Sequence, residues 1–203
     1  MKQLFFSSVL LVAMTQCPAM ADNWAHWRGP TGNGVATNAQ PPVQWSSTKN
    51  VKWKVAIPGR GSGSPVTWQQ RVFVVTAVPV DDDTGQETSK LAFKLLCFDR
   101  GNGRMLWDQT ATVATPHEEI QETNTFASAS PCTDGKHVYA HFGSRGLYCY
   151  TMDGKLEWKR DDFEPMETRS SFGEGSSPTL EGDKILVPWD HEGQSYLYAL
   201  DKS

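Results

Sequence analysis

Short apolar stretches separated by turn residues recur along this chain. Three of them, at 71–78, 137–142 and 184–189, each follow a Ser-Pro dipeptide and a turn, and two of those turns are Asp134-Gly135 and Glu181-Gly182. Apolar runs of this length bounded by turns predict strands, and the 3.6-residue period of an amphipathic helix is absent throughout. The chain is therefore predicted to be all-β.

A repeated segment gives these strands an order. It reads Cys-Phe-Asp-Arg-Gly-Asn-Gly-Arg-Met-Leu-Trp at 97–107, recurs one residue shorter at 149–158, and begins again at 199–201. Asn-Gly and Asp-Gly are strong hairpin signals, because both central residues of the favoured turn need a positive φ. Each copy therefore predicts two antiparallel strands with a Trp on the second. The constant place of that Trp predicts a packing contact between neighbouring units.

The repeat resembles the Trp-docking motif, Ala-x-Asp-x-x-Thr-Gly-Lys-x-x-Trp, of the pyrroloquinoline-quinone-type β-propellers. Thr151 replaces the Asp in the second copy. The resemblance implies a propeller of four-stranded antiparallel blades, in which the motif residues are structural, and a shared fold alone says little about chemistry. The matching residues are Cys97, Asp99, Asn102, Gly103, Arg104 and Trp107 in the first copy, and Cys149, Gly154, Lys155 and Trp158 in the second.

The Ser-Pro dipeptides place three blades on the chain. Blade one is predicted at 63–110, blade two at 128–160, and blade three at 176–203 without its fourth strand. Residues 50–57, with Trp53, are predicted to be a closing strand, so the propeller region covers 50–203. A propeller closes with at least about four blades, and members of this family have about eight. We therefore expect the chain to be the first part of a longer protein.

The N-terminal 21 residues resemble a secretory signal. Lys2 supplies a positive charge, 4–14 an apolar core, and Ala19-Met20-Ala21 a cleavage site, so cleavage is predicted after Ala21. The apolar run is shorter than the roughly 20 residues that span a bilayer. Cys17 follows Gln16, which disfavours a lipoprotein signal. The chain is thus predicted to be exported, to the periplasm or the extracellular space.

Residues 22–49 form an irregular leader rich in Trp, Gly and Pro. Trp24 and the segment Trp27-Arg28-Gly29-Pro30 suggest a leader pinned onto the folded body, and its opening is similar to that of secreted members of the propeller family. A flexible leader with exposed aromatic residues is the alternative. The chain has a net charge of −4, and loss of Lys2 with the signal makes it −5. This charge argues against a nucleic-acid partner, which needs a basic surface.

The acidic residues gather in one set of loops. In an up-and-down blade, the connections between the second and third strands and those between blades share one face; here they are 79–90, 111–126, 143–146, 161–175 and 190–194. We expect this face to bind a protein partner or a cationic ligand, although exposed loops are also commonly acidic. Lys90, Arg145 and Arg169 oppose the acids, and His117 and His191 lie among them. The acids are Asp81, Asp82, Asp83, Glu87, Glu118, Glu119, Glu122, Asp161, Asp162, Glu164, Glu167, Glu174, Asp190 and Glu192.

The cysteines and the reactive residue types indicate no particular chemistry. Cys97, Cys132 and Cys149 remain after cleavage, an odd number, and we expect all three to be small buried residues. Cys132 and Cys149 would lie on strands two apart, about 9.5 Å from each other, which is too far for a disulfide. No spacing typical of metal ligands is present, so no metal site is predicted.

Several segments with residue types that occur in functional sites allow two interpretations. Asp81-Asp82-Asp83-Thr84-Gly85 lacks the alternating ligands and the distal Glu of a helix-loop-helix calcium site, which favours a solvated turn. Asp190-His191-Glu192 fits acid–base chemistry or a short turn equally. Trp189 and Phe172 are predicted to pack within the protein. No catalytic His-Asp pair at recognisable spacing accompanies Ser170, Ser171, Ser176 and Ser177.

Two classes of function remain. The first is an exported, non-catalytic binding or scaffold propeller of the cell envelope, similar to the propeller of the outer-membrane assembly machinery. The second is a pyrroloquinoline-quinone-dependent dehydrogenase, which the resemblance implies would also carry calcium, a catalytic Asp and two adjacent cysteines. The sequence contains no adjacent cysteines. We therefore favour the scaffold, with no catalytic residue and no cofactor predicted, and its partner stays open.

Overall fold

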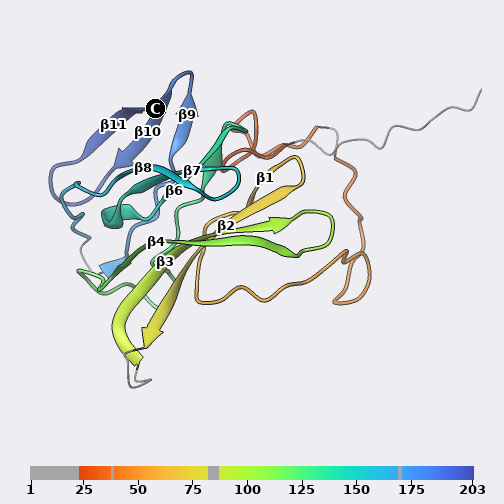
Figure 1. Ribbon diagram of the computed structural model, residues 1–203, viewed down its shortest axis with the longest axis horizontal. Coiled ribbons are helices and arrows are strands. Elements are labelled where there is room, and N and C mark those ends of the chain that lie inside the picture. The colour runs from red at the N-terminus through yellow and green to blue at the C-terminus, as the bar shows by residue number, and fades with distance from the viewer. Residues whose placement is uncertain (1–22, 38, 82–86, 169–170) are drawn as a thin grey trace, which may run out of the picture.

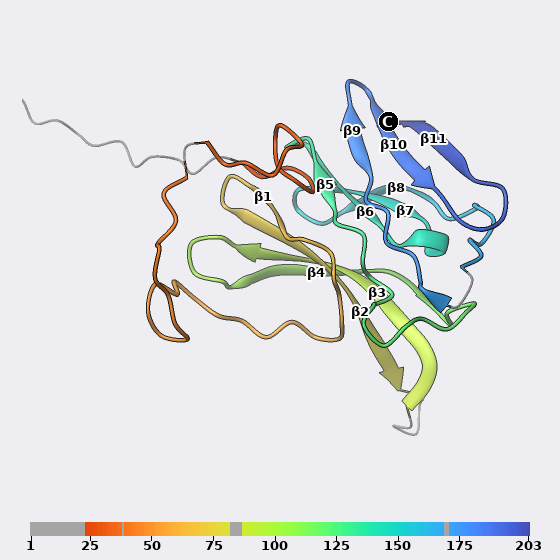
Figure 2. The same ribbon diagram turned by 180° about the vertical axis from the view of Figure 1, so that it is seen from behind.

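The computed structural model describes residues 23–37, 39–81, 87–168 and 171–203. The predicted signal segment lies outside these residues. So do Asp82, Asp83, Thr84, Gly85, Arg169 and Ser170, together with the side chain of Glu87. The described residues contain three antiparallel sheets, which Figures 1 and 2 show side by side.

Each sheet is a meander in which consecutive strands pair. The first has the order β1-β2-β3-β4, formed by Val66–Trp68, Arg71–Asp81, Glu87–Asp99 and Met105–Ala114. The second has the order β5-β6-β7-β8, formed by Cys132–Thr133, His137–His141, Leu147–Thr151 and Leu156–Arg160. The third consists of β9, β10 and β11, at Thr179–Glu181, Lys184–Trp189 and Tyr196–Asp201. A 3₁₀ turn, Gly143–Arg145, joins β6 to β7. The predicted all-β class with four-stranded antiparallel sheets is confirmed.

Three details differ from the sequence prediction. The closing strand expected over 50–57 has no ladder partner among the described residues, and residues 51–57 are irregular there. The expected loop 79–90 is largely strand, because the β2–β3 ladder continues through Pro79↔Leu91 to Asp81↔Glu87. The β3–β4 ladder likewise reaches Leu91↔Ala114, so the first sheet ends beyond residue 110.

The core lies between neighbouring sheets. Phe73, Phe93 and Leu95 of the first sheet pack with Val138 and Tyr148 of the second. The other face of the second sheet and the third sheet share a further cluster, formed by Cys132, Tyr139, Leu147, Cys149, Ile185, Val187 and Trp189. The alternation of side chains across a strand lets one sheet bury both of its faces in this way. The sheets therefore stack as blades.

The three cysteines are buried and free within this core, as predicted. Each is 0 % exposed, and they lie on β3, β5 and β7. Burial raises the pKa of the Cys97 and Cys149 thiols to about 12, and that of Cys132 is also raised. Because the thiolate is the reactive form, these side chains act as inert packing groups at neutral pH.

The first strands of the sheets lie closest together. β1 contacts β5, and β5 contacts β9, whereas β4 and β8 are the last strands of their sheets. The leader that precedes β1 runs as a long irregular segment beside the first sheet (Figure 1). Trp24 pins its start, since the backbone of Trp24 pairs with that of Thr67 in β1. The long connections between the sheets, which contain loops 115–126 and 161–175, form the surface that we call the loop face.

Candidate functional site

Each Trp of the repeated segment docks onto the neighbouring sheet. The Trp107 indole Nε1–H donates to the carbonyl oxygen of Met152 over 3.0 Å, and that of Trp158 donates to the carbonyl of Lys202 over 3.0 Å. Arg100, Met152 and Lys202 hold the same place in the three copies of the repeat. Trp53 makes the equivalent bond to the Arg100 carbonyl, at 2.9 Å, although its own segment is not a strand.

The glycines of the motif serve the turn and the docking contact together. Gly103 and Gly154 have φ values of 76° and 86°, in the left-handed region that favours glycine. A Cβ on Gly154 would lie 2.8 Å from Cδ2 of Trp107, and one on Gly103 would lie 2.7 Å from Cε3 of Trp53. Each ring therefore sits directly on a glycine of the next turn.

The remaining motif residues support the same junctions. Asp99 Oδ1 accepts hydrogen bonds from the backbone amides of Gly101 and Asn102, at 2.8 and 3.0 Å, and so holds the turn. Cys97 pairs across the ladder with Trp107, and Cys149 with Trp158, so a small side chain stands beside each ring. These contacts place the motif residues Cys97, Asp99, Gly103, Trp107, Cys149, Gly154 and Trp158 at the sheet junctions.

A second ladder links the sheets at their inner strands. The Ser64 amide donates to Oγ of Ser130 over 2.8 Å, and the Ser130 amide donates to Oγ of Ser177 over 2.9 Å. These residues belong to the Ser-Pro dipeptides that mark each blade. The repeat is visible in the sequence, but its hydrogen bonds are not. Their hydroxyl and amide groups line a groove beside the inner strands. The serines thus act as connectors between blades.

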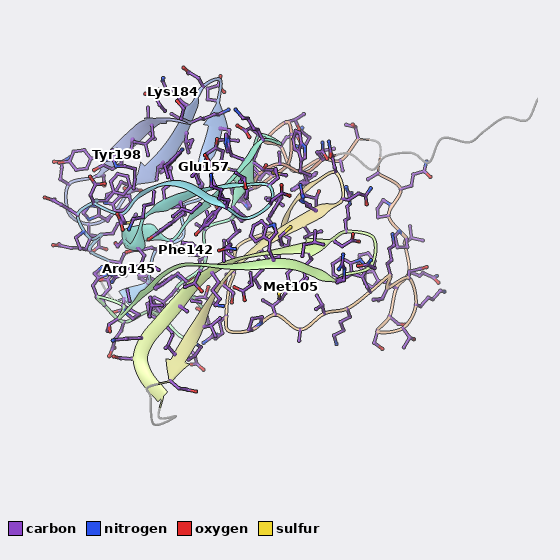
Figure 3. All side chains as sticks on the ribbon, in the orientation of Figure 1. Met105, Phe142, Arg145, Glu157, Lys184 and Tyr198 are labelled. Atoms are coloured by element: carbon purple, nitrogen blue, oxygen red, sulfur yellow. The ribbon has the colours of Figure 1, made fainter. Side chains whose placement is uncertain are left out.

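The loop face is organised around His117. Its Nε2–H donates to the carbonyl oxygen of Met166 over 2.8 Å, and its Nδ1 accepts from the Arg145 guanidinium over 2.9 Å. Arg145, labelled in Figure 3, lies in the 3₁₀ turn of the second sheet. The next residue, Glu118, accepts from Oγ1 of Thr168 over 2.6 Å. Loops 115–126 and 161–175, distant in sequence, are therefore joined to each other and to blade two.

Glu174 completes this arrangement. Its carboxylate accepts from the Ser144 amide over 2.5 Å and from the Ser144 hydroxyl. Gly143 makes room for it, because a Cβ at that position would lie 1.6 Å from the Glu174 oxygen. Nε2 of His117 lies 3.7 Å from Glu174 and 3.9 Å from Glu118. Two carboxylates and one imidazole thus converge on one point.

A small cavity lies next to this convergence, and His141 forms part of its wall. The cavity has a volume of about 30 Å³. His141 is 1 % exposed, and its ring lies 5.9 Å from that of Trp189. Its Nδ1 lies 3.1 Å from the carbonyl oxygen of Ser176, and its Nε2 has no hydrogen-bond partner among the described residues. Burial lowers the pKa of His141 to about 4, so the ring is neutral at pH 7.

The other acids of the loop face divide into paired and open groups. Asp161 binds Lys159 at 2.6 Å, and Asp162 binds Arg160 at 2.7 Å, so their charges are partly balanced within their own segment. Asp190 accepts from the Ser195 hydroxyl. The other exposed acids on loops 115–126 and 161–175 are Glu119, Glu122, Glu164 and Glu167.

The structure bears on the Asp190-His191-Glu192 segment and on the predicted packing of Trp189 and Phe172. His191 Nδ1 accepts from the amides of Glu167 and Gly193, both at 3.1 Å, which gives the Asp190-His191-Glu192 segment a place in turn structure. Trp189 is 1 % exposed and packs as predicted. The prediction that Phe172 packs is wrong, since it is 59 % exposed. Its loop is held instead by the Asn124 side chain, which donates to the Phe172 carbonyl, and the ring projects outward.

Comparison with known families resolves the fold family. A family model described as outer membrane protein assembly factor BamB matches residues 91–203, more than half of the chain. The chain belongs to this family. The predicted membership in the pyrroloquinoline-quinone-like β-propeller repeats is thereby confirmed, and the three stacked sheets are blades of such a propeller.

One solved structure that resembles this chain is distant from it in sequence. A crystal structure of BamB from Moraxella catarrhalis is 14 % identical, with a TM-score of 0.34, and the match covers 71 % of this chain and 48 % of that one. The chain thus spans about half the length of that BamB structure. No curated protein matches the chain. In the part of the chain that the structure describes, no helix is long and apolar enough to cross a membrane.

Proposed function

We propose that this chain is an exported, non-catalytic β-propeller that serves as a scaffold in the assembly of outer-membrane proteins. The observation that carries the proposal is the match of residues 91–203 to the family of outer membrane protein assembly factor BamB. The two ladders between blades, through Trp and through Ser, support it, because they make a rigid body that can present long loops. The cysteines that could be reactive are buried instead.

The acidic loop face is the proposed binding surface. Glu119, Glu122, Glu164 and Glu167 are exposed there, on two loops that the His117 network fixes relative to blade two. Phe172 adds an exposed aromatic ring to the same loops. A fixed patch of like charge steers a basic partner towards it, and an aromatic ring inside the patch supplies apolar contact area. The partner that fits is a protein surface rich in Lys and Arg.

The assembly role is tested in the cell that makes the protein. Deleting the gene should lower the level of outer-membrane β-barrel proteins, and the parent gene should restore it. A variant with Glu119, Glu122, Glu164 and Glu167 changed to Gln should restore it less well, because the partner surface has lost its charge. The matched control changes Glu181 and Glu157, acids outside the loop face, to Gln and should restore it fully. Unchanged barrel levels after deletion would refute the assembly role.

Export is tested separately. The signal pattern at 1–21 leads us to expect that mass spectrometry of the exported product begins at Asp22. An uncut precursor that stays in the cytoplasm would contradict export, and with it the envelope role.

The quinoprotein alternative has a direct test of its own. The described residues do not fit the quinone site that the alternative needs, because Cys97, Cys132 and Cys149 are buried on three different strands. We therefore expect no tight binding when the protein is titrated with pyrroloquinoline quinone and calcium, followed by absorbance and fluorescence. Stoichiometric micromolar binding with alcohol-dependent dye reduction would favour a dehydrogenase over the scaffold.

A further inference from the structure

The convergence of His117, Glu118 and Glu174 has the chemistry of a metal site. One ligand atom from each residue lies within 4.8 Å of the other two. The carbonyl oxygen of Met166 lies 2.8 Å from the same imidazole nitrogen, which adds a fourth donor atom. The side chains are 28 %, 24 % and 17 % exposed, so the cluster is partly shielded from water while an ion could still enter.

The two carboxylates are held in place by other residues. Thr168 donates its hydroxyl to Glu118, and Ser144 donates its hydroxyl and its amide to Glu174. Hydrogen bonds of this kind orient the carboxylate ligands of known metal sites. One oxygen of each carboxylate lies within 4.8 Å of the other, where their negative charges repel unless a cation lies between them.

A second observation points to a ligand at the same place. His141 lines the cavity that His117, Glu118 and Glu174 also line, and its buried Nε2 is without a partner among the described residues. Because Nδ1–H donates to the Ser176 carbonyl, Nε2 is an acceptor and needs a donor. The cavity of about 30 Å³ has room for one or two water molecules. A metal-bound water is a strong donor that would satisfy Nε2.

We propose that this cluster binds one divalent transition-metal ion of the zinc class, through Nε2 of His117, the carboxylates of Glu118 and Glu174, and the Met166 carbonyl. Imidazole with carboxylate oxygens suits Zn²⁺ and its neighbours, whereas Ca²⁺ and Mg²⁺ take oxygen ligands. The ion joins loops 115–126 and 161–175 to the turn of blade two. The site goes beyond the scaffold role proposed above and does not depend on it.

Binding requires one rearrangement, which makes the proposal specific. In the structure His117 accepts from Arg145 at Nδ1 and carries its proton on Nε2. When a metal binds Nε2, that proton moves to Nδ1 and the imidazole stays neutral. The Nδ1–H then points at the N–H groups of Arg145, and two donors cannot form a hydrogen bond. Arg145 must then turn away, and it also repels the incoming cation. Arg145 therefore competes with the ion.

The test measures zinc binding by the exported protein after chelator treatment and dialysis. Isothermal titration with Zn²⁺ should show one saturable site per chain with a dissociation constant in the micromolar range or below, and Ca²⁺ and Mg²⁺ should bind at least about tenfold more weakly. Mass-spectrometric metal analysis of the loaded protein gives the stoichiometry. Absence of saturable zinc binding would overturn the proposal.

Matched variants locate the ion. His117→Gln, Glu118→Gln and Glu174→Gln should each weaken zinc binding at least about tenfold, while Glu119→Gln and Glu167→Gln, exposed acids of the same two loops, should leave it unchanged. Arg145→Gln should tighten it several-fold, an effect that a purely structural role of Arg145 does not produce. Unchanged affinity in His117→Gln and Glu118→Gln would place the ion elsewhere and refute the site.

One measurement needs no variant, in case the substitutions unfold the loops. X-ray absorption of the zinc-loaded parent should show nitrogen and oxygen neighbours with the signature of a single imidazole. Sulfur neighbours would show that a cysteine binds the metal, and two or more imidazoles would show a different site. Either result overturns the proposal.

Discussion

Trp107 combines two contacts in one side chain. Its indole N–H donates to Met152 of the next blade, and its ring covers Gly154, whose missing Cβ leaves the space. Trp158 repeats the hydrogen bond on Lys202. Because both residues are half-buried at a junction between sheets, their loss removes apolar contact and leaves a carbonyl without its donor.

We therefore predict that Trp107→Ala and Trp158→Ala each lower the free energy of unfolding by about 3 to 5 kcal/mol. Chemical denaturation followed by tryptophan fluorescence and circular dichroism measures this. Trp45→Ala is the control, since Trp45 is 71 % exposed on the leader and should change stability by less than about 0.5 kcal/mol. If both junction variants matched the control, the docking contacts would not stabilise the fold.

His141 should make the stability of the protein depend on pH. Burial lowers its pKa from 6.5 to about 4 in the folded protein, so between these values the unfolded chain binds more protons than the folded one. Stability is then complete above pH 6.5 and falls as the pH drops towards 4, by about 3 kcal/mol in total.

His141→Phe lacks the titrating group and should lose this slope. The measurement is urea denaturation from pH 7.5 to 4.5, with a chelator present so that no cation contributes. His26→Gln, on the leader, should keep the slope of the parent. Parallel curves for the parent and His141→Phe would contradict the assignment.

At the scale of elements, the blades are connected at both ends of each sheet. The Trp contacts lie at the hairpin turns of the repeated segment, whereas the Ser contacts lie just before the first strands. The first strands are short, with only two residues in β5, and their own ladders add little. The Ser bonds therefore contribute much of the order along the inner strands.

Removing one Ser hydroxyl should leave an amide of the neighbouring blade without its hydrogen-bond acceptor and so lower the free energy of unfolding. Ser130 is 3 % exposed, and Ser130→Ala leaves the Ser64 amide without its acceptor, at a cost of about 1 to 3 kcal/mol in the free energy of unfolding. Ser177→Ala should act in the same way on the amide of Ser130. Amide hydrogen exchange at Ser64 and Ser130 reports each lost bond directly. Protection at these amides that survives the substitution would refute the ladder.

At the scale of the whole described chain, the third sheet has three strands whereas the second has four. β7 is paired on both sides, by β6 and β8, whereas β11 pairs only with β10 among the described strands. Tyr196 and Leu197 of β11 are 51 % and 67 % exposed. A free strand edge with apolar side chains is a template for pairing with other chains.

We predict that the polypeptide 22–203 self-associates in solution and that the amides of β11 exchange faster than those of β7. Sedimentation and hydrogen exchange test this. Leu197→Lys places a charge on the edge strand and should reduce the association, whereas Lys184→Arg on β10 should not. A monodisperse monomer with equal protection in β7 and β11 would contradict the prediction.

The sequence by itself determined the class of the fold. Turn residues at Gly103 and Gly154 and the Ser-Pro repeat act locally, through backbone conformations that few residues adopt, so their meaning can be read along the chain. Residues 50–57 alternate as a strand should but have no ladder partner in the part of the chain that the structure describes, and a strand exists only when a ladder forms.

Tertiary structure alone decided the contents of the loop face. His117 and Glu118 are neighbours on one loop and Glu174 lies on another, and no spacing rule joins two loops that only the packing of blade against blade brings together. His141 is part of an apolar strand in the sequence, and nothing there shows that its second nitrogen has no partner among the residues that the structure describes. Turns and strand periods depend on neighbours in the chain, whereas a site of this kind depends on the distances between loops, which the whole fold sets.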